Sequence, residues 1–580
     1  MKLSKVIIHN YRGIIDGEFN LYDYTLLVGE KKKKKTTVIN AIRTFFDQDI
    51  SFNKEHDFPK SGYRDNNSWV EISFKLTQDE SELLVEQLGE NALSEENILK
   101  IKRFFISQEE KIKTNELYYC DSTNGYQKFC TVRQLKDEKK LGDVIYIPAV
   151  AKIEEQTKLT GKSTLRELIA NILSDVVEKS LPYQDFKNSL ELFTREIKKT
   201  KSNDNHSLED FEHDFNEALK SWEVKFGLTF PAPPIEDIVK TILKWNLTDK
   251  QSGKEHDSEN FGSGFQRLFM YSLIQLKAKY TSASPSEKST KFSPRLTLLL
   301  FEEPEAFLHP PQQEILSRQL QVLSKSEQNQ VLCSTHSAHF VNRNSEDLKA
   351  LVKLKREHSV VKLFQISEDV WNELVSNNIA LSKVLERYPK LKKGMEEEDS
   401  TREMEVLKHF LWLNSERSSL FFAKHVLLVE GVTEVALINK LVDDGVVDIS
   451  SSDAYVMDCL GKFNIHRFIS LLTILSINHS VFIDDDKSEE YHQDIHDFIE
   501  ECRDSSLTTC IEFVPDNIEK YLGISPANRS DKKPQHVLYE YSEGKLNQDS
   551  LKEYCKLLAK CIPGAKVDET KFKTLTPSLV

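Results

Sequence analysis

Two short apolar runs in the last third of this 580-residue chain, each ending in acidic residues, constrain its fold more than any other feature. Residues 426–429 run into Glu430, and residues 481–483 run into Asp484 and Asp486. Short β-branched runs of this kind are typical of buried parallel strands, whose carboxyl ends meet at one edge of a sheet. We therefore expect these acids to converge from neighbouring strands of an α/β domain.

The spacing of the acids predicts a metal site. Asp484 and Asp486 share a face of an extended chain, while Asp485 points away. Glu434 lies in the first turn of an expected helix, and Glu519 follows a later strand. Clustered carboxylates repel one another unless hard cations hold them, and all-oxygen ligands suit Mg²⁺ or Mn²⁺. The ligands expected from this spacing are Glu430, Asp484 and Asp486.

The N-terminal residues predict a phosphate-binding loop. A strand at residues 25–28 leads into Gly29, and a helix with apolar residues at helical spacing follows Lys35 and Thr36. In a P-loop the backbone N–H groups cradle phosphate, the lysine neutralises it, and the hydroxyl binds Mg²⁺. Gly29, Lys35 and Thr36 match the pattern G-x-x-x-x-G-K-[ST].

Position 34 departs from that pattern, because it holds Lys34 where the pattern requires glycine. The glycine allows a backbone conformation and a close approach to phosphate that a side chain obstructs. Five consecutive lysines, from Lys31 to Lys35, are also unusual inside a structural loop. We interpret this segment as an altered P-loop, engineered or degraded, and expect ATP binding to be impaired.

A further apolar run, at residues 296–301, lies upstream of the C-terminal pair and ends in Glu302 and Glu303. A buried strand ending in two acids is typical of a Walker B element, in which Glu302 would hold Mg²⁺ and Glu303 would polarise the attacking water. His336 ends a further strand, 33 residues after Glu303, and is expected to sense the γ-phosphate.

A Ser/Gly run, which includes Ser263, Gly264 and Gln266, opens a helix before the Walker B strand. It is similar to the signature motif of ABC-type ATPases, and the order of all these motifs resembles an ABC/SMC-type ATPase head. The resemblance implies ATP with Mg²⁺ bound between two heads, with the signature motif contacting nucleotide in the partner. A homodimer or higher homo-oligomer is therefore implied.

The C-terminal acids resemble the topoisomerase–primase (TOPRIM) fold, in which Glu-Gly follows one strand and Asp-x-Asp a later one. Together with the upstream motifs, they are similar to the OLD (overcoming lysogenization defect) family of nucleases. That resemblance implies metal-dependent DNA cleavage and assigns Lys533 as the late lysine that stabilises charge on the scissile phosphate. It also implies two cations, held by Glu430, Glu434, Asp484, Asp486 and Glu519. It also extends to Gabija-like and retron-associated anti-phage effectors, which implies a partner protein or retron RNA/DNA.

The expected fold class is α/β: an ABC/SMC-type ATPase head with a helical insertion, followed by a Rossmann-like TOPRIM domain. Helical spacing at residues 186–197 and 208–226 predicts a helix-rich insertion, for which the resemblance to such ATPases implies dimer contacts, and the charged residues 345–420 are expected to be helical. The expected limits are 1–154 and 256–400 for the head, 155–255 for the insertion, 401–424 for a connector and 425–580 for TOPRIM.

Composition narrows the class of protein. No apolar run approaches the about 20 residues that span a bilayer, so no membrane partner and a cytoplasmic location are expected. The eight cysteines form no Cys-x-x-Cys pair, which argues against a zinc site. A net charge of −14 argues against a generally basic surface, but a local basic groove or bound metal is sufficient for DNA.

Two alternatives stay open. The chain could be a DNA-binding ATPase scaffold whose TOPRIM domain is inactive and only docks a partner. Primase or topoisomerase chemistry is the second, although a topoisomerase needs a nucleophilic tyrosine and a basic DNA gate, and no such region is evident. The DNA recognised, the trigger and the direction of ATP control are not readable from the residues.

Overall fold

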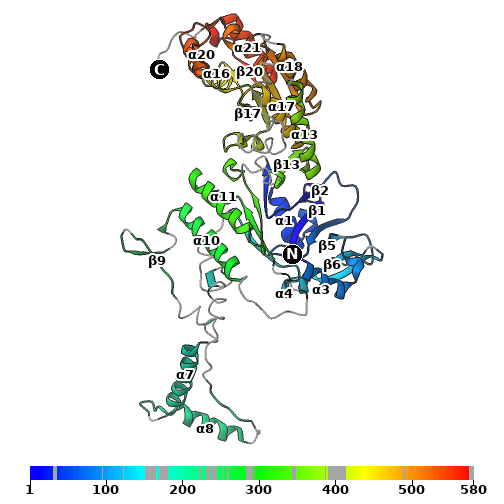
Figure 1. Cartoon of the computed structure of the whole chain (residues 1–580). Helices are drawn as coiled ribbons and strands as arrows, with labels where there is room; N and C mark the ends of the chain where they lie inside the picture. The colour runs from blue at the N-terminus through cyan, green and yellow to red at the C-terminus, as the bar shows by residue number, and fades with distance from the viewer. Residues whose placement is uncertain are drawn as a thin grey trace. The chain divides into compact units, whose positions relative to one another are not determined.

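The computed structural model describes residues 1–29, 35–94, 96–121, 123–149, 163, 165–166, 169, 180–204, 206–220, 224–229, 237, 244–250, 252–257, 260–281, 292, 294, 296–341, 348–385, 387–388, 413–486 and 490–573. The chain divides into two compact units, Met1–Ala149 with Ser289–Val580, and Val150–Lys288. The first unit holds two sheets of a head lobe and the sheet of a C-terminal lobe, residues 413–573 (Figure 1).

A mixed six-stranded sheet carries the nucleotide motifs of the head lobe. Its order is β14-β13-β3-β12-β11-β8, and every neighbouring pair is parallel except β13 with β14. The strands are β3 (Tyr24–Gly29), β8 (Asp143–Ile147), β11 (Thr297–Glu302), β12 (Asn329–Ser334), β13 (Leu351–Glu357) and β14 (Val360–Gln365). Strands β3 and β12 are buried along their whole length, as expected for near-continuous apolar runs in a parallel sheet.

A second, antiparallel sheet completes the head lobe. Its order is β2 (Ile14–Asn20), β1 (Lys2–Tyr11), β4 (Ser68–Lys75), β5 (Ile98–Ile106), β6 (Glu116–Asp121) and β7 (Gly125–Thr131). Helix α1 (Lys35–Phe46) contacts strands of both sheets and shares one hydrophobic core with them. Because α1 is buried on nearly every side, Phe45 and Ile42 are inaccessible to water, and the helix start is held rigidly at the end of β3.

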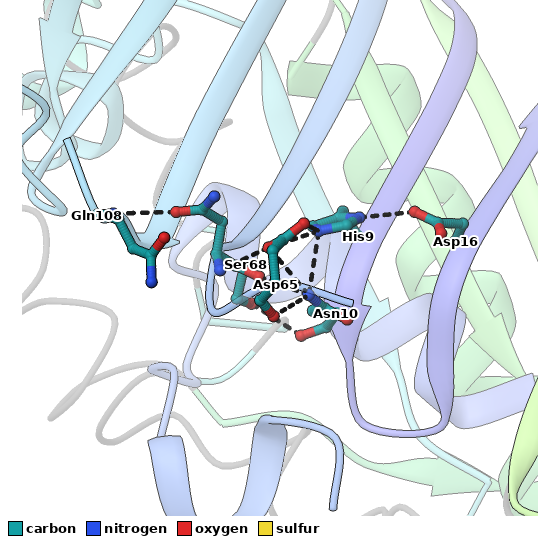
Figure 2. A network of polar contacts seen from close by, with 7 residues as sticks. His9, Asn10, Asp16, Asp65, Ser68 and Gln108 are labelled. Atoms are coloured by element: carbon teal, nitrogen blue, oxygen red, sulfur yellow. Dashed lines mark hydrogen bonds and ion pairs between the residues drawn. The ribbon is translucent and has the colours of Figure 1, made fainter. Parts of the chain in front are cut away.

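A polar network fixes the chain before β4 against β1 (Figure 2). His9 lies between two carboxylates, with Nδ1 2.6 Å from Asp16 Oδ1 and Nε2 3.1 Å from Asp65 Oδ2. Asn10 Nδ2 donates to the carbonyl oxygens of Asp65 and Asn67 at 3.1 and 2.8 Å. These hydrogen bonds satisfy the backbone oxygens of Asp65 and Asn67, and they hold the segment before β4 against the end of β1.

The C-terminal lobe is built on a four-stranded parallel sheet in the order β17-β15-β18-β19. The strands are β15 (His425–Val429), β17 (Ala454–Asp458), β18 (Asn478–Asp484) and β19 (Thr508–Val514). The helices are α16 (Val432–Asp443), α17 (Ile465–Ile474), α18 (Tyr491–Glu501), α19 (Ile518–Tyr521), α20 (Lys533–Ser542) and α21 (Gln548–Cys561). A core that includes Leu427, Phe482 and Tyr554 packs α16, α20 and α21 onto the sheet. The expected order of strands and helices in this lobe is confirmed.

Part of residues 345–420, which were expected to be helical, forms a β-hairpin instead. β13 and β14 form it, and β13 also pairs in parallel with β3, so the prediction of helix at residues 351–365 was wrong. The reason is that apolar residues and lysines alternate from Val352 to Lys355, which is the period of a strand, and that the chain turns at His358; Leu351 to Leu354 are all buried. Helix α13 (Glu368–Leu385) agrees with the expectation, and residues 389–412 lie outside the described part.

In the second unit, α7 (Leu181–Lys199) and α8 (Leu208–Leu219) pack as a helical pair, and α10 (Ser263–Thr281) is a separate helix. The prediction that the second helix continues to Phe226 was wrong. The Asn216 side chain pairs with both backbone groups of Phe226, at 2.7 and 2.9 Å, and turns the chain back onto α8. This unit starts at Val150 and includes α10, whereas the insertion was expected at 155–255; the domain limits themselves stay a prediction.

Short 3-10 helices link these parts, and two recur below: η4 (Ala338–Phe340) follows β12, and η6 (Arg417–Phe422) precedes β15. In the residues that the structure describes, none of the helices has the length and apolar character needed to span a bilayer.

The close contact between β3 and β13 gives a test of this architecture. A Cβ on Gly29 would lie 2.5 Å from the carbonyl oxygen of Leu354, and the glycine has a φ of +155°. We expect Gly29→Ala to lower the free energy of unfolding by about 1–3 kcal/mol, because overpacking displaces backbone. Chemical denaturation measures this, with Gly227→Ala as the control, since a Cβ there meets nothing within 4 Å. Equal stability of both variants would contradict the strand pairing.

Candidate functional site

The predicted acids meet at the carboxyl edge of the C-terminal sheet. β15 pairs with β18 in parallel, and Val429 lies opposite Phe482. Glu430 therefore follows the end of one strand at the level where the neighbouring strand reaches Asp484. The pairing of these two strands, expected from their apolar runs, is confirmed.

Asp484 and Glu434 are the most buried acids of the group, each 5% exposed. Asp484 Oδ2 accepts a hydrogen bond from Ile518 N at 2.9 Å, and Glu434 Oε2 accepts one from Gly431 N at 2.9 Å. Burial, followed by the charge of Asp484, raises the pKa of Glu434 to about 8. Burial also raises the pKa of Asp484 to about 6, with the charge of Glu430 acting in the same direction.

Two lysines offset this negative charge. Lys462 is buried, and its Nζ donates to the backbone oxygen of Asp484 at 2.8 Å and lies 3.9 Å from Glu430 Oε2. Lys533 begins α20, and its charge lowers the pKa values of Glu430, Glu434 and Asp484, each of which burial raises overall. The structure thus brings Lys533 within electrostatic reach of the acids.

Lys462 was not predicted as a functional residue. It lies in a turn between the two acidic runs, and in sequence a single lysine in a turn resembles an exposed one. Its 4% exposure is the distinguishing feature, and burial follows from the packing of η7 (Lys462–Asn464) rather than from any local pattern.

Asp486 and Glu519 are connected to the other acids less directly than Glu430, Glu434 and Asp484 are to one another. β18 ends at Asp484, and Asp486 has a φ of +27°, so the chain leaves the extended path from which a shared face was argued. The charge of Asp486 still raises the pKa of Glu430, where burial has the larger effect, and its carboxylate is 3.7 Å from His492 Nε2. Glu519 is buried one residue after Ile518, and its Oε1 accepts a hydrogen bond from Ala527 N at 2.7 Å.

The donor set suits a hard cation, because it consists of carboxylates that raise one another's pKa. In the described residues, however, no three His, Cys, Asp or Glu side chains stand together as a ready metal site. The cause is visible in the hydrogen bonds: Glu434, Asp484 and Glu519 are each directed at a backbone N–H. A cation here would compete with those bonds.

The nucleotide motifs converge at the carboxyl edge of the mixed sheet. Lys35 is 4% exposed and donates from Nζ to Thr335 O at 2.8 Å and Gly29 O at 3.4 Å. Burial lowers the pKa of Lys35 to about 8, against the opposing charges of nearby acids. The Thr36 hydroxyl donates to Glu302 Oε1, so the two predicted Mg²⁺ ligands are in direct contact.

The other head residues also lie together. His336 Nε2 is 3.3 Å from Glu303 Oε1, and Glu303 has a φ of +43° at the turn that ends β11. Two contacts were not predicted: Tyr146 OH donates to Glu302 Oε2 at 2.5 Å, and the buried Glu305 accepts from His336 N at 2.6 Å. Burial raises the pKa of Glu305. Glu305 is the third acid of the Walker B segment, and it could have been included among the predicted site residues from the sequence alone.

Two predicted nucleotide segments are not placed at this edge. Glu30 and the lysines at 31–34 lie outside the described residues, so the altered P-loop stays a prediction. Ser263, Gly264 and Gln266 open α10 as expected, with Gln266 Nε2 donating to Phe261 O at 2.8 Å, but they belong to the second unit.

Two family models match the chain, one described as AAA ATPase domain, over residues 90–341. The other is the overcoming lysogenization defect protein-like TOPRIM domain, over residues 421–486. The chain joins an AAA ATPase domain to an OLD-like TOPRIM domain. The TOPRIM match contains both the Glu430 and the Asp484 strand ends.

Relatives cover both domains. Old nuclease of Escherichia phage P2 is 23% identical over 537 residues, covering 89% of this chain and 82% of the relative. Endonuclease GajA of Bacillus cereus (strain VD045) is 23% identical over 556 residues, covering 93% and 84%. An SMC head domain from Thermotoga maritima aligns with 63% of this chain and 100% of its own, at 13% identity and a TM-score of 0.31.

The raised pKa values in the TOPRIM domain predict a pH dependence. The folded-state pKa of Glu434 is about 8 and that of Asp484 about 6, against ordinary values of 4.5 and 3.8. Between these limits the folded state binds more protons than the unfolded state, so stability falls as pH rises. We expect these two acids to lower the melting temperature, measured in chelator, as pH rises from 5 to about 8, while the lowered pKa values of His425 and His496 act in the opposite direction below about pH 6.5.

The matched variants are Glu434→Gln and Asp484→Asn, which remove the titrating groups and should flatten this dependence. Added Mn²⁺ should raise the melting temperature of the parent more at high pH than at low pH, because cation and protons compete for the same oxygens. If the melting temperature of both variants depended on pH in the same way as that of the parent, the pKa assignment to Glu434 and Asp484 would be refuted.

Proposed function

We propose that this protein is a divalent-metal-dependent DNA endonuclease controlled by its ABC-type ATPase head. The observation that carries the proposal is the edge of the TOPRIM sheet, where Glu430, Glu434 and Asp484 repel one another beside Lys462 and Lys533. Such a site attracts both cations and phosphate. The names of the relatives, nuclease and endonuclease, support the same activity.

The residues that would hold the Mg²⁺ or Mn²⁺ ions are Glu430, Glu434, Asp484 and Asp486, with Glu519. Two such ions supply an activated water and charge neutralisation at a phosphodiester. The protein's own groups do the rest. Lys533 lies within electrostatic reach of the acids and would draw the phosphate toward the edge, while Lys462 keeps Asp484 and Glu430 in place through the contacts described above.

In the head, Lys35 would bind nucleotide phosphate and Thr36 with Glu302 would bind Mg²⁺, since the two side chains already contact each other. Glu303, paired with His336, would orient the attacking water. Ser263, Gly264 and Gln266 of a second copy would complete the nucleotide site, which makes the active form a homodimer or higher homo-oligomer. We place the activity in cytoplasmic anti-phage defence, with DNA as substrate and with a partner protein or retron RNA/DNA as the trigger.

Conservative substitutions of the acids test the nuclease. We expect Asp484→Asn and Glu430→Gln to lower plasmid cleavage in Mn²⁺ by roughly 100-fold or more, since loss of groups that merely support metal ligands costs about 10–100-fold. The amide of Asn can still accept from Ile518 N, so the fold should persist.

The matched control is Asp516→Asn, an acid beyond the end of β19 that pairs with the exposed Lys520. It should cleave at the parent rate. Full activity in both site variants would refute the proposal, and a parent without cleavage under any metal or nucleotide condition would favour a scaffold whose TOPRIM domain only docks a partner.

The lysine run gives a separate test of the head. We expect Lys34→Gly to bind ATP more tightly than the parent chain, because glycine lets the loop backbone approach phosphate. Isothermal titration in Mg²⁺ measures the affinity, and Lys34→Ala, which removes the charge but keeps a Cβ, separates geometry from charge. Equal affinity of parent and Lys34→Gly would show that the run does not impair binding.

A further inference from the structure

Two lysines on one face of β13 contact the C-terminal lobe. Lys353 and Lys355 are two residues apart in a strand, so their side chains point the same way. Lys353 is 3% exposed and donates to the backbone oxygen of Phe421. Lys355 Nζ lies 3.2 Å from Ser476 Oγ and 3.3 Å from Asn478 Oδ1. β13 is therefore bonded both to η6 and to the start of β18.

The same strand adjoins the nucleotide site. Lys353 pairs in register with Val28, the residue before Gly29. η6 itself packs against β3 and against η4, which begins two residues after His336. Thr335, whose carbonyl holds Lys35, donates its own N–H to Leu27 O at 3.1 Å. A shift of β3, or of η4 just after His336, would therefore displace η6, which packs against both.

The other end of η6 is bonded to the nuclease sheet. Arg417 donates to Asp458 Oδ1 from Nε at 2.9 Å and from Nη2 at 2.5 Å. The two side chains are only 14% and 17% exposed, so the ion pair is largely shielded from solvent. Tyr455 OH donates to Glu416 O at 2.9 Å. These contacts hold the start of η6 against β17.

β17 leads straight into the acidic edge. Asp458 is its last residue, and the next turn donates from Cys459 N to Val429 O at 2.9 Å and from Gly461 N to Glu430 O at 2.8 Å. Lys462 follows and contacts both Asp484 and Glu430. A displacement of Asp458 would therefore move the backbone of Glu430. It would also move Lys462, which contacts Asp484 and Glu430.

We propose that η6 couples the two sites: nucleotide bound at β3 and His336 repositions Glu430 and Lys462 through the contacts of Lys353 with Phe421 and of Arg417 with Asp458. Arg417 and Lys353 are positioning residues, because neither touches nucleotide or the acids. The inference rests on the proposed function and specifies how its nucleotide control is transmitted. η6 has two bonded ends and packs on η4, which follows His336, whereas a passive linker needs only a covalent connection.

Hydrogen exchange tests the coupling without any nuclease assay. In Lys34→Gly, a non-hydrolysable ATP analogue at a saturating concentration should change amide exchange in residues 454–465, which include the N–H groups of Cys459 and Gly461. In the Lys34→Gly background, Lys353→Met keeps the apolar stem and removes the donor, and Arg417→Gln removes the charge; each should abolish this response while nucleotide affinity stays at the value of Lys34→Gly alone.

The matched controls are Lys362→Met, on the neighbouring strand where the lysine pairs with Glu357, and Arg503→Gln, an exposed arginine near Glu500. Both should retain the exchange response. No nucleotide response at 454–465 in Lys34→Gly, or an unchanged response in both Lys353→Met and Arg417→Gln, would overturn the inference.

Cleavage provides the second measurement. If nucleotide changes the cleavage rate of Lys34→Gly by about five-fold or more, a usual size for coupling between sites, the same ratio in Lys353→Met and Arg417→Gln should fall to near one. Retention of the ratio in both variants would overturn the coupling. Absence of cleavage with an intact, Lys353-dependent exchange response would instead refute the proposed function and leave the coupling standing.

Discussion

Parallel strand pairing is the constraint on which both candidate sites depend. Because paired parallel strands end at one edge, residues far apart in the chain meet there without any local contact between them. In the head, this brings Thr36, just after β3, to Glu302 at the end of β11; in the TOPRIM domain it brings Glu430 to Asp484. The same geometry occurs in both lobes: it brings together the residues of the predicted nucleotide motifs at one edge and a group of acids at the other.

Burial then sets the chemistry at each edge, and it acts with opposite sign on opposite charges. Lys35 and Glu434 have nearly the same exposure, yet burial lowers the pKa of the lysine and raises that of the glutamate, both to about 8. At neutral pH the lysine therefore keeps its charge, whereas the glutamate is largely protonated and neutral. A phosphate beside Lys35 would favour its charged form further, and a cation at Glu434 would bind with release of a proton.

Much of this arrangement was readable from the sequence, because apolar runs followed by acids specify strands and the edge to which they point. The strands ending at Glu430 and Asp484, and the order of the nucleotide motifs, were predicted on that basis. What could not be read depends on long-range packing. Lys462 is a turn lysine whose burial comes from its surroundings, and Asp486 leaves the extended path through a positive φ. The β13–β14 hairpin had a readable period of two, hidden by its charged residues.

The position of β13 has a consequence for separating the domains. The AAA match ends at residue 341, yet β3 is flanked on one side by β12 and on the other by β13, which comes later in the chain. A head cut at the end of the match would expose the phosphate-loop strand as an unpaired edge, open to pairing with another chain. The autonomous folding unit of the ATPase therefore extends at least through Gln365, into the segment that also contacts the nuclease sheet. The end of the AAA match, at residue 341, therefore differs from the end of the segment that the head sheet needs to complete its strand pairing, at Gln365.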